Sequence, residues 1–163
     1  MKTIEAVIAQ HKDAILKQWT EATIRTYPAE TVPFFLREKD RFANPVAGLL
    51  TESLEKVVKG MAGQASDQEL AESLDAAIRV RAVQNFTPSQ AVGFIFLLKE
   101  IFRSIVDADE AFFSLLDRKV DELVLIGFNK YVACREKIFA LKAYEVRNRT
   151  FKAFERAGLV KDA

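Results

Sequence analysis

The stretch TPSQAVGFIFLLKEIFR, residues 87–103, decides the fold of this chain. Thr87 is a good N-cap, Pro88 suits the first helical position, and Gln90 stands where it can close a capping box. On a helical projection, the apolar residues between Phe94 and Ile105 fill well over half of the circumference. The stretch therefore predicts one central helix, running to about residue 105, that neighbouring helices cover on most sides.

A polar strip on this predicted helix contains one aromatic residue. Lys99, Glu100 and Arg103 mark the strip, and Phe96 points between them. A monomer normally has a polar side chain at a solvent-facing position such as this one. Phe96 therefore either lies under a loop or marks the interface of a dimer. Phe96 and Arg103 are therefore candidate interface residues.

Composition limits the classes of protein that this chain can belong to. Its 163 residues fit one domain, half of them are hydrophobic, and the formal net charge is +1. This balance favours neither a nucleic-acid-binding surface nor a disordered tail. One cysteine, Cys134, and one histidine, His11, exclude an internal disulfide and the usual Cys/His zinc cages.

The expected location is the cytoplasm. The N-terminus has charges every few residues and lacks the apolar core of a signal peptide. No apolar run approaches the roughly 20 residues that cross a bilayer. We expect a soluble protein with no metal and no cofactor.

Helical signals fill the chain, and no sustained alternation or hairpin motif predicts a strand. The fold is predicted to be an all-α bundle of about five helices, over residues 3–26, 45–60, 66–84, 87–105 and 110–156. An unbroken last helix would span about 70 Å, so part of it must project or bend. Residues 1–143 are predicted to form the helical domain and residues 144–163 a projecting C-terminal arm of that domain.

Catalytic motifs are lacking, because there is no phosphate loop, nucleophile elbow or zinc-protease helix. A nucleophilic Cys134 activated by His11 would need two helices to cross at one point. Buried cysteines and satisfied core histidines are far commoner than such a pair. A lone histidine on a first helix is also a poor haem ligand, although Trp19 could line a pocket near it. We predict that the protein is not an enzyme.

Two arginines fall on apolar helix faces. Arg81 lies near the centre of the stripe formed by Leu70, Leu74 and Ile78, and Arg135 is placed similarly on the last helix. Burying a guanidinium without a partner costs several kcal/mol. Each arginine either pairs with a structural acid or snorkels to the surface, or else it helps to bind a small anion or acid. The candidate acids are Asp121, Glu100 and Glu38, and the candidate ligand-binding residues are Arg81, Gln90, Arg135, His11 and Trp19.

Aromatic residues also occur on the charged arm. Tyr144, Phe151 and Phe154 are difficult to bury within one subunit. Pairing of two arms, or docking of one arm on a partner protein, would cover them.

Three segments carry a resemblance to a known family: RFANPVAGLL (41–50), RVRAVQNFTPSQAVGFIFLLKE (79–100) and FNKYVACREKIFALK (128–142). They resemble the RsbRD-type N-terminal sensor domain, related to the RsbT co-antagonists of bacterial stressosomes, over roughly residues 10–147. The resemblance implies a globin-like, non-haem domain that dimerises and passes a signal through its last helix. Family members commonly precede a STAS output domain. Since the sequence stops at Ala163, we expect a stand-alone member.

Together these observations predict a non-enzymatic bacterial signalling, sensor or adaptor module. It is expected to form a homodimer and to bind an unidentified protein through the arm, without nucleic acid or membrane partners. The alternative is a small-molecule binding protein whose pocket is lined by buried arginines and takes an anionic or apolar ligand.

Overall fold

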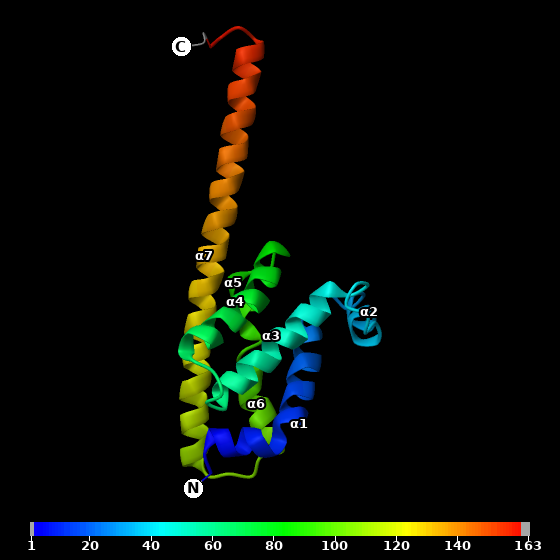
Figure 1. The fold of residues 1–163 in the computed structure, drawn as a ribbon, viewed down its shortest axis with the longest axis vertical. Helices are drawn as coiled ribbons and strands as arrows, with labels where there is room; N and C mark the ends of the chain where they lie inside the picture. Colours follow the sequence, from blue (N-terminus) through cyan, green and yellow to red (C-terminus); the bar gives the residue numbers. More distant parts are fainter. Residues whose placement is uncertain (1, 161–163) are drawn as a thin grey trace.

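The computed structural model describes residues 2–160, and every regular element within that range is an α-helix. The helices are α1 (Ile4–Ile24), α2 (Val32–Arg37), α3 (Pro45–Met61), α4 (Asp67–Val83), α5 (Pro88–Gly93), α6 (Leu97–Ile105) and α7 (Glu110–Arg156). The first six gather beside the lower part of α7, which continues well beyond them (Figure 1). The prediction of an all-α fold with a long last helix is confirmed, and the globin-like comparison stays a prediction.

The predicted helix starts are confirmed because they depend on local chemistry. Thr87 and Gln90 form a capping box at α5, and Ser66 and Glu69 form another at α4. The side chain of Asn44 accepts a hydrogen bond from the backbone N–H of Ala47 at the start of α3. Each cap satisfies N–H groups that the first turn of a helix leaves without partners.

The predicted central helix is wrong in one respect, because it is two helices separated by a turn at residues 94–96. The backbone N–H groups of Ile95, Phe96 and Leu98 bond carbonyls three residues back rather than four. Such tight turns interrupt the α-helical hydrogen-bond ladder and leave carbonyls to be satisfied elsewhere.

Two buried side chains satisfy carbonyls around this turn. Trp19 Nε1 donates to the carbonyl of Phe94 over 2.8 Å, a carbonyl that would accept from the N–H of Leu98 in a regular helix. Arg81 Nη2 donates to the carbonyl of Gln90, one turn earlier, over 2.7 Å. The break is thus held by α1 and α4.

The first helix is also less regular than predicted. It ends at Ile24 rather than Thr26, and His11 has non-helical dihedrals, with φ at −121° and ψ at 15°. Figure 1 shows the blue N-terminal segment crossing the base of the molecule before α1 turns along the domain. His11 therefore lies at a bend.

The core is built mainly where α4 packs against α3 and α7, and where α1 packs against α3 and α6. Its largest fully buried apolar side chains include Trp19, Leu54, Ile78 and Leu98. Gly127 lets α7 approach the turn between α5 and α6, since a Cβ there would lie 2.9 Å from Cδ1 of Ile95. The absence of a side chain at this position is a packing requirement.

The two halves of α7 lie in different surroundings. Its buried residues, from Phe112 to Tyr131, occur every three or four positions and face the domain. Beyond Ile138 the helix is almost entirely exposed, and it leaves the domain as a single rod (Figure 1). A boundary between residues 143 and 144 stays a prediction, and residues 161–163 of the predicted arm lie outside the described residues.

Hydropathy gives no sign of a bilayer-crossing segment within residues 2–160, where every helix is too short or too polar to span one.

Candidate functional site

The guanidinium of Arg81 is completely buried, with 0% of the residue exposed. Its Nη2 donates to the hydroxyl oxygen of Thr26 over 2.9 Å and to the carbonyl of Gln90 over 2.7 Å. The last turn of α4 carries Arg81, the end of α1 leads to Thr26, and Gln90 lies on α5. Three segments distant in the sequence therefore meet at this one side chain.

Aromatic rings enclose the same guanidinium. Its Cζ lies 4.3 Å from the ring centroid of Phe86, 5.1 Å from that of Phe94 and 5.2 Å from that of Tyr27. Ring faces attract a cation, but they do not neutralise its charge. The positive charge of Arg81 is therefore stabilised only in part.

A carboxylate partner for Arg81 is missing within residues 2–160, so the prediction of a structural acid is wrong for this residue. Asp121, one of the acids considered, pairs with Lys99 over 2.7 Å instead. The Nε and Nη1 atoms of Arg81 have no hydrogen-bond partner. Burial lowers the pKa of Arg81, because desolvation disfavours the charged form.

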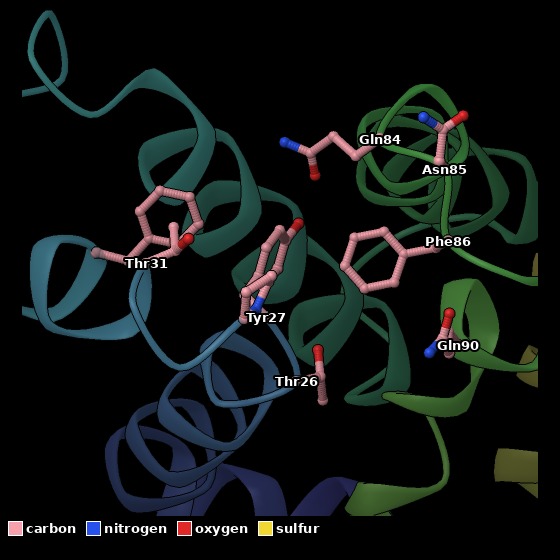
Figure 2. A pocket seen from close by; sticks show the side chains of 9 residues that line it. Thr26, Tyr27, Thr31, Gln84, Asn85, Phe86 and Gln90 are labelled. Carbon is pink, nitrogen blue, oxygen red and sulfur yellow. The ribbon is translucent and has the colours of Figure 1, made fainter.

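A cleft of about 550 Å³ lies next to this guanidinium. Figure 2 shows it between the end of α1 and the connection from α4 to α5, with Tyr27 and Phe86 side by side and Gln84 beyond them. Its walls combine aromatic rings with hydroxyl and amide groups: Thr26, Tyr27, Pro28, Thr31, Phe35, Gln84, Asn85, Phe86 and Gln90. A cleft of this size and mixed character can hold a small organic molecule.

Tyr27 contributes a second unsatisfied polar group. The residue is 6% exposed, and its hydroxyl has no hydrogen-bond partner. Burial raises the pKa of Tyr27. The nearby positive charge of Arg81 acts in the other direction, but burial has the larger effect. The phenol therefore stays protonated at neutral pH and can donate a hydrogen bond.

The structure brings together two of the five predicted ligand-binding residues. Gln90 lines the cleft, and its carbonyl accepts a hydrogen bond from Arg81. His11, Trp19 and Arg135 are not among the residues that line this cleft. The five residues therefore do not share one pocket there, because α1 places His11 and Trp19 along its length and α7 places Arg135 on another side of α4.

Each of these three residues has a different environment. Trp19 is buried, stacks on Phe94 with ring centroids 6.0 Å apart, and holds the turn between α5 and α6. Arg135 Nη1 donates to the carbonyl of Ala82 over 3.3 Å, which satisfies a carbonyl in the last turn of α4. His11 is half-buried at the bend of α1.

Tyr27 and Phe86 form the wall between the cleft and Arg81, and neither was predicted as a site residue from the sequence. Both lie just beyond the ends of helices, where helical periodicity says nothing about burial. An aromatic residue beside a proline-marked break, as in Tyr27-Pro28 and Phe86-Thr87-Pro88, is a local signal that could have identified them.

The predicted interface residues lie on a second surface. Phe96 is 44% exposed, with the Lys99 ammonium 5.4 Å from its ring centroid. Arg103 is engaged within its own subunit, because Nη1 and Nη2 donate to the two carboxylate oxygens of Asp117 over 3.1 and 2.8 Å. The structure therefore leaves Phe96, rather than Arg103, available to a second molecule.

Exposed apolar side chains continue along α7. Five of them recur three, four or seven residues apart and form what we call the α7 stripe: Leu125, Phe128, Val132, Phe139 and Val146. The ion pairs Arg103–Asp117 and Lys99–Asp121 set an antiparallel register that places Phe96 level with the start of this stripe. Tyr144, Phe151 and Phe154 are each about half exposed farther along the helix.

The sequence of this chain is similar to that of a known protein family. Residues 13–145 match the family described as the RsbT co-antagonist protein rsbRD N-terminal domain. An uncharacterized protein of Archaeoglobus fulgidus is 25% identical over 134 residues, which cover 80% of this chain and 82% of the relative. No solved structure matches the chain. The chain therefore belongs to the RsbT co-antagonist protein rsbRD N-terminal domain family, which is a family of stressosome-type signalling and sensor domains.

Proposed function

We propose that this protein is a non-enzymatic signalling module that pairs with a second copy and contacts a protein partner through its arm. The observation that carries the proposal is the α7 stripe, which begins on the domain beside Phe96 and continues past the last buried residue, Tyr131. One continuous helix thus connects the core to an exposed apolar surface. A change within the domain can reach the arm without crossing a flexible joint.

Pairing of two copies is favoured at the domain end of the stripe. Phe96, Leu125, Phe128 and Val132 are exposed there without a cover from their own chain. Contiguous exposed apolar residues of this kind are typical of protein interfaces. Pairing along the whole stripe is less favourable, because Arg135, Lys142 and Arg149 recur at seven-residue spacing, each three residues after one of its last three members.

The C-terminal half of α7 favours a different kind of partner. Residues 135–156 contain seven Lys and Arg residues against three Glu residues, although the whole chain has a net charge of only +1. A basic helix with exposed Tyr144, Phe151 and Phe154 complements an apolar groove with an acidic rim. We propose a protein with such a groove as the partner.

Charge substitution in the stripe tests the pairing. Phe128→Glu places a carboxylate in the proposed seam, and light scattering is expected to show a shift from dimer to monomer. Phe42→Glu is the matched control, because Phe42 is 98% exposed and lies away from α7. A wild-type protein that is monomeric, or a Phe128→Glu variant that remains dimeric, contradicts the proposed pairing.

Truncation tests the role of the arm. A chain that ends after Leu141 is expected to fold, because the last buried residue of α7 is Tyr131. It is also expected to lose the partner protein in pull-down experiments that use the full chain as the reference. If the truncated chain unfolds, the arm is part of the core and the proposal fails.

A further inference from the structure

The geometry points to a binding site for a small monocarboxylate with an apolar body, located in the cleft beside Arg81. This inference deepens the proposed sensor function, on which its biological use depends, because it names the chemical class of the input.

Charge is the first step. Arg81 is fully buried and has no carboxylate partner within the described residues. An unpaired buried charge is strongly unfavourable, and a ligand anion beside it would supply the missing counter-charge. The protein separates the guanidinium from the cleft by only one layer, since Thr26 and Gln90 bond its Nη2 and also line the cleft.

Hydrogen-bond donors are the second step. The Nε and Nη1 atoms of Arg81 lack partners, and the buried hydroxyl of Tyr27 lies near the guanidinium without making a hydrogen bond of good geometry. All of these groups can donate, so the ligand group that satisfies them must accept hydrogen bonds. A carboxylate accepts through both oxygens and carries the charge that Arg81 requires.

The rest of the cleft limits the ligand further. Its lining contains no lysine and no arginine, so Arg81, which lies behind Thr26, Phe86 and Gln90, is the one positive charge beside it among the described residues, and a single charge favours a monoanion over a phosphate dianion. The rings of Tyr27, Phe35 and Phe86 form apolar walls, which suit an aromatic or aliphatic body. The volume of about 550 Å³ lies within the usual range for small organic ligands.

Phe86 controls the approach to the guanidinium. Its ring is the nearest of the three to Arg81, and it is carried by the connection between α4 and α5. The preceding residue, Asn85, has a φ of 62°, in the left-handed region that Asn tolerates better than most residues. Arg81 does not itself line the cleft, so the carboxylate of the ligand reaches the guanidinium only when the half-buried Phe86 ring turns aside.

Benzoate is the probe that tests the site, with benzamide as its neutral analogue and inorganic phosphate as a second anion. Titration calorimetry and thermal unfolding of the full chain at constant ionic strength measure the binding. Benzoate is expected to bind and to raise the melting temperature, whereas benzamide and phosphate bind more weakly. Equal effects of benzoate and benzamide, or no effect of benzoate, overturn the proposal.

Substitution of Arg81 tests the counter-charge. Arg81→Met is expected to weaken benzoate binding by about ten- to a hundred-fold, the range for a hydrogen bond to a charged group. Without benzoate, the same variant is expected to melt at a higher temperature, because an unpaired buried charge has been removed. Arg79→Met is the matched control, since Arg79 is exposed on the same helix and pairs with Asp75. Unchanged benzoate affinity in Arg81→Met overturns the proposal.

Two further variants keep the test decisive. If Arg81→Met does not fold, Tyr27→Phe removes the unpaired hydroxyl alone and is expected to weaken benzoate binding several-fold. Phe128→Glu, which addresses pairing, is expected to bind benzoate as the wild type does. Pairing and benzoate binding are therefore measured separately. A wild-type protein that is monomeric but binds benzoate contradicts the proposed pairing alone, and a dimer that does not bind benzoate contradicts this site alone.

Discussion

Arg81 and the C-terminal arm both bring cations and aromatic rings together, one in the core and the other at the surface. Arg81 puts a cation in the core, surrounded by aromatic rings. The arm puts aromatic rings in water, among cations such as Arg147, whose Cζ lies 5.7 Å from the ring centroid of Tyr144. Each placement is unfavourable for an isolated chain, and we propose that a different kind of molecule relieves each one: a small anion inside and a protein surface outside. We therefore expect substitutions in the core to change the free energy of unfolding, and substitutions in the arm to change the binding of a partner protein.

The largest expected effect is in the core. Trp19→Ala is expected to lower the free energy of unfolding by about 3–5 kcal/mol, because it leaves a cavity and an unpaired Phe94 carbonyl. Urea unfolding followed by far-ultraviolet circular dichroism measures this change, since the variant lacks the chain's only tryptophan. A loss below about 1 kcal/mol would show that the turn between α5 and α6 does not depend on α1.

A smaller effect is expected where α7 touches the domain. Gly127→Ala is expected to lower the free energy of unfolding by about 1–3 kcal/mol, because the new Cβ would lie 2.9 Å from Cδ1 of Ile95. Gly93→Ala is the control, since a Cβ at Gly93 meets nothing within 4 Å. Its expected change is neutral or stabilising by up to about 1 kcal/mol. Similar destabilisation by both substitutions would contradict this packing role.

The Arg103–Asp117 ion pair, one of two that join α6 to α7, is expected to contribute a few tenths of a kcal/mol, because it is partly exposed. The hydrogen bond from Arg103 lowers the pKa of Asp117. Its contribution is therefore present above the unfolded carboxyl pKa of about 3.9 and is lost as the pH falls through the lower, folded value. Melting temperatures of wild type and Arg103→Gln should differ slightly at neutral pH and converge in strong acid. A difference that grows on acidification would contradict this assignment.

The smallest expected effect on folding is in the arm. A double substitution of Phe151→Ser and Phe154→Ser is expected to change the free energy of unfolding by less than about 0.5 kcal/mol, because both rings are about half exposed. Partner binding is expected to be lost in the same variant, as measured by pull-down. Marked destabilisation of the monomer would show that the arm packs on its own domain.

Local signals explain how much of the fold could be predicted. The capping boxes at Ser66 and Thr87 and the cap at Asn44 identify helix starts, because a cap involves only residues within one turn. The turn at residues 94–96 could not be predicted in the same way. Trp19 satisfies the Phe94 carbonyl of this turn and Arg81 satisfies the Gln90 carbonyl in α5. Both side chains are distant in the sequence, so tertiary hydrogen bonds override the helical pattern.

The candidate site was likewise predicted only in part: the burial of Arg81 follows from local sequence, but the residues around it do not. Helical periodicity places Arg81 on the buried face of α4, and its burial confirms this prediction. Periodicity does not identify the groups that face it, and the acids considered as its partners lie elsewhere. Tyr27 and Phe86 reach the guanidinium from two connections, whose paths depend on how α1, α4 and α5 pack.

The uninterrupted length of α7 has a mechanical consequence. From Tyr131, its last buried residue, to Arg156 at its end, the helix extends by about 38 Å. A rigid rod of that length converts angle into distance, so a tilt of about ten degrees at Tyr131 would displace the far end by about 6–7 Å. That displacement exceeds one full turn of helix. Subtle repacking around Gly127 and Tyr131 would therefore be amplified at the tip into a movement large enough to make or break a protein contact.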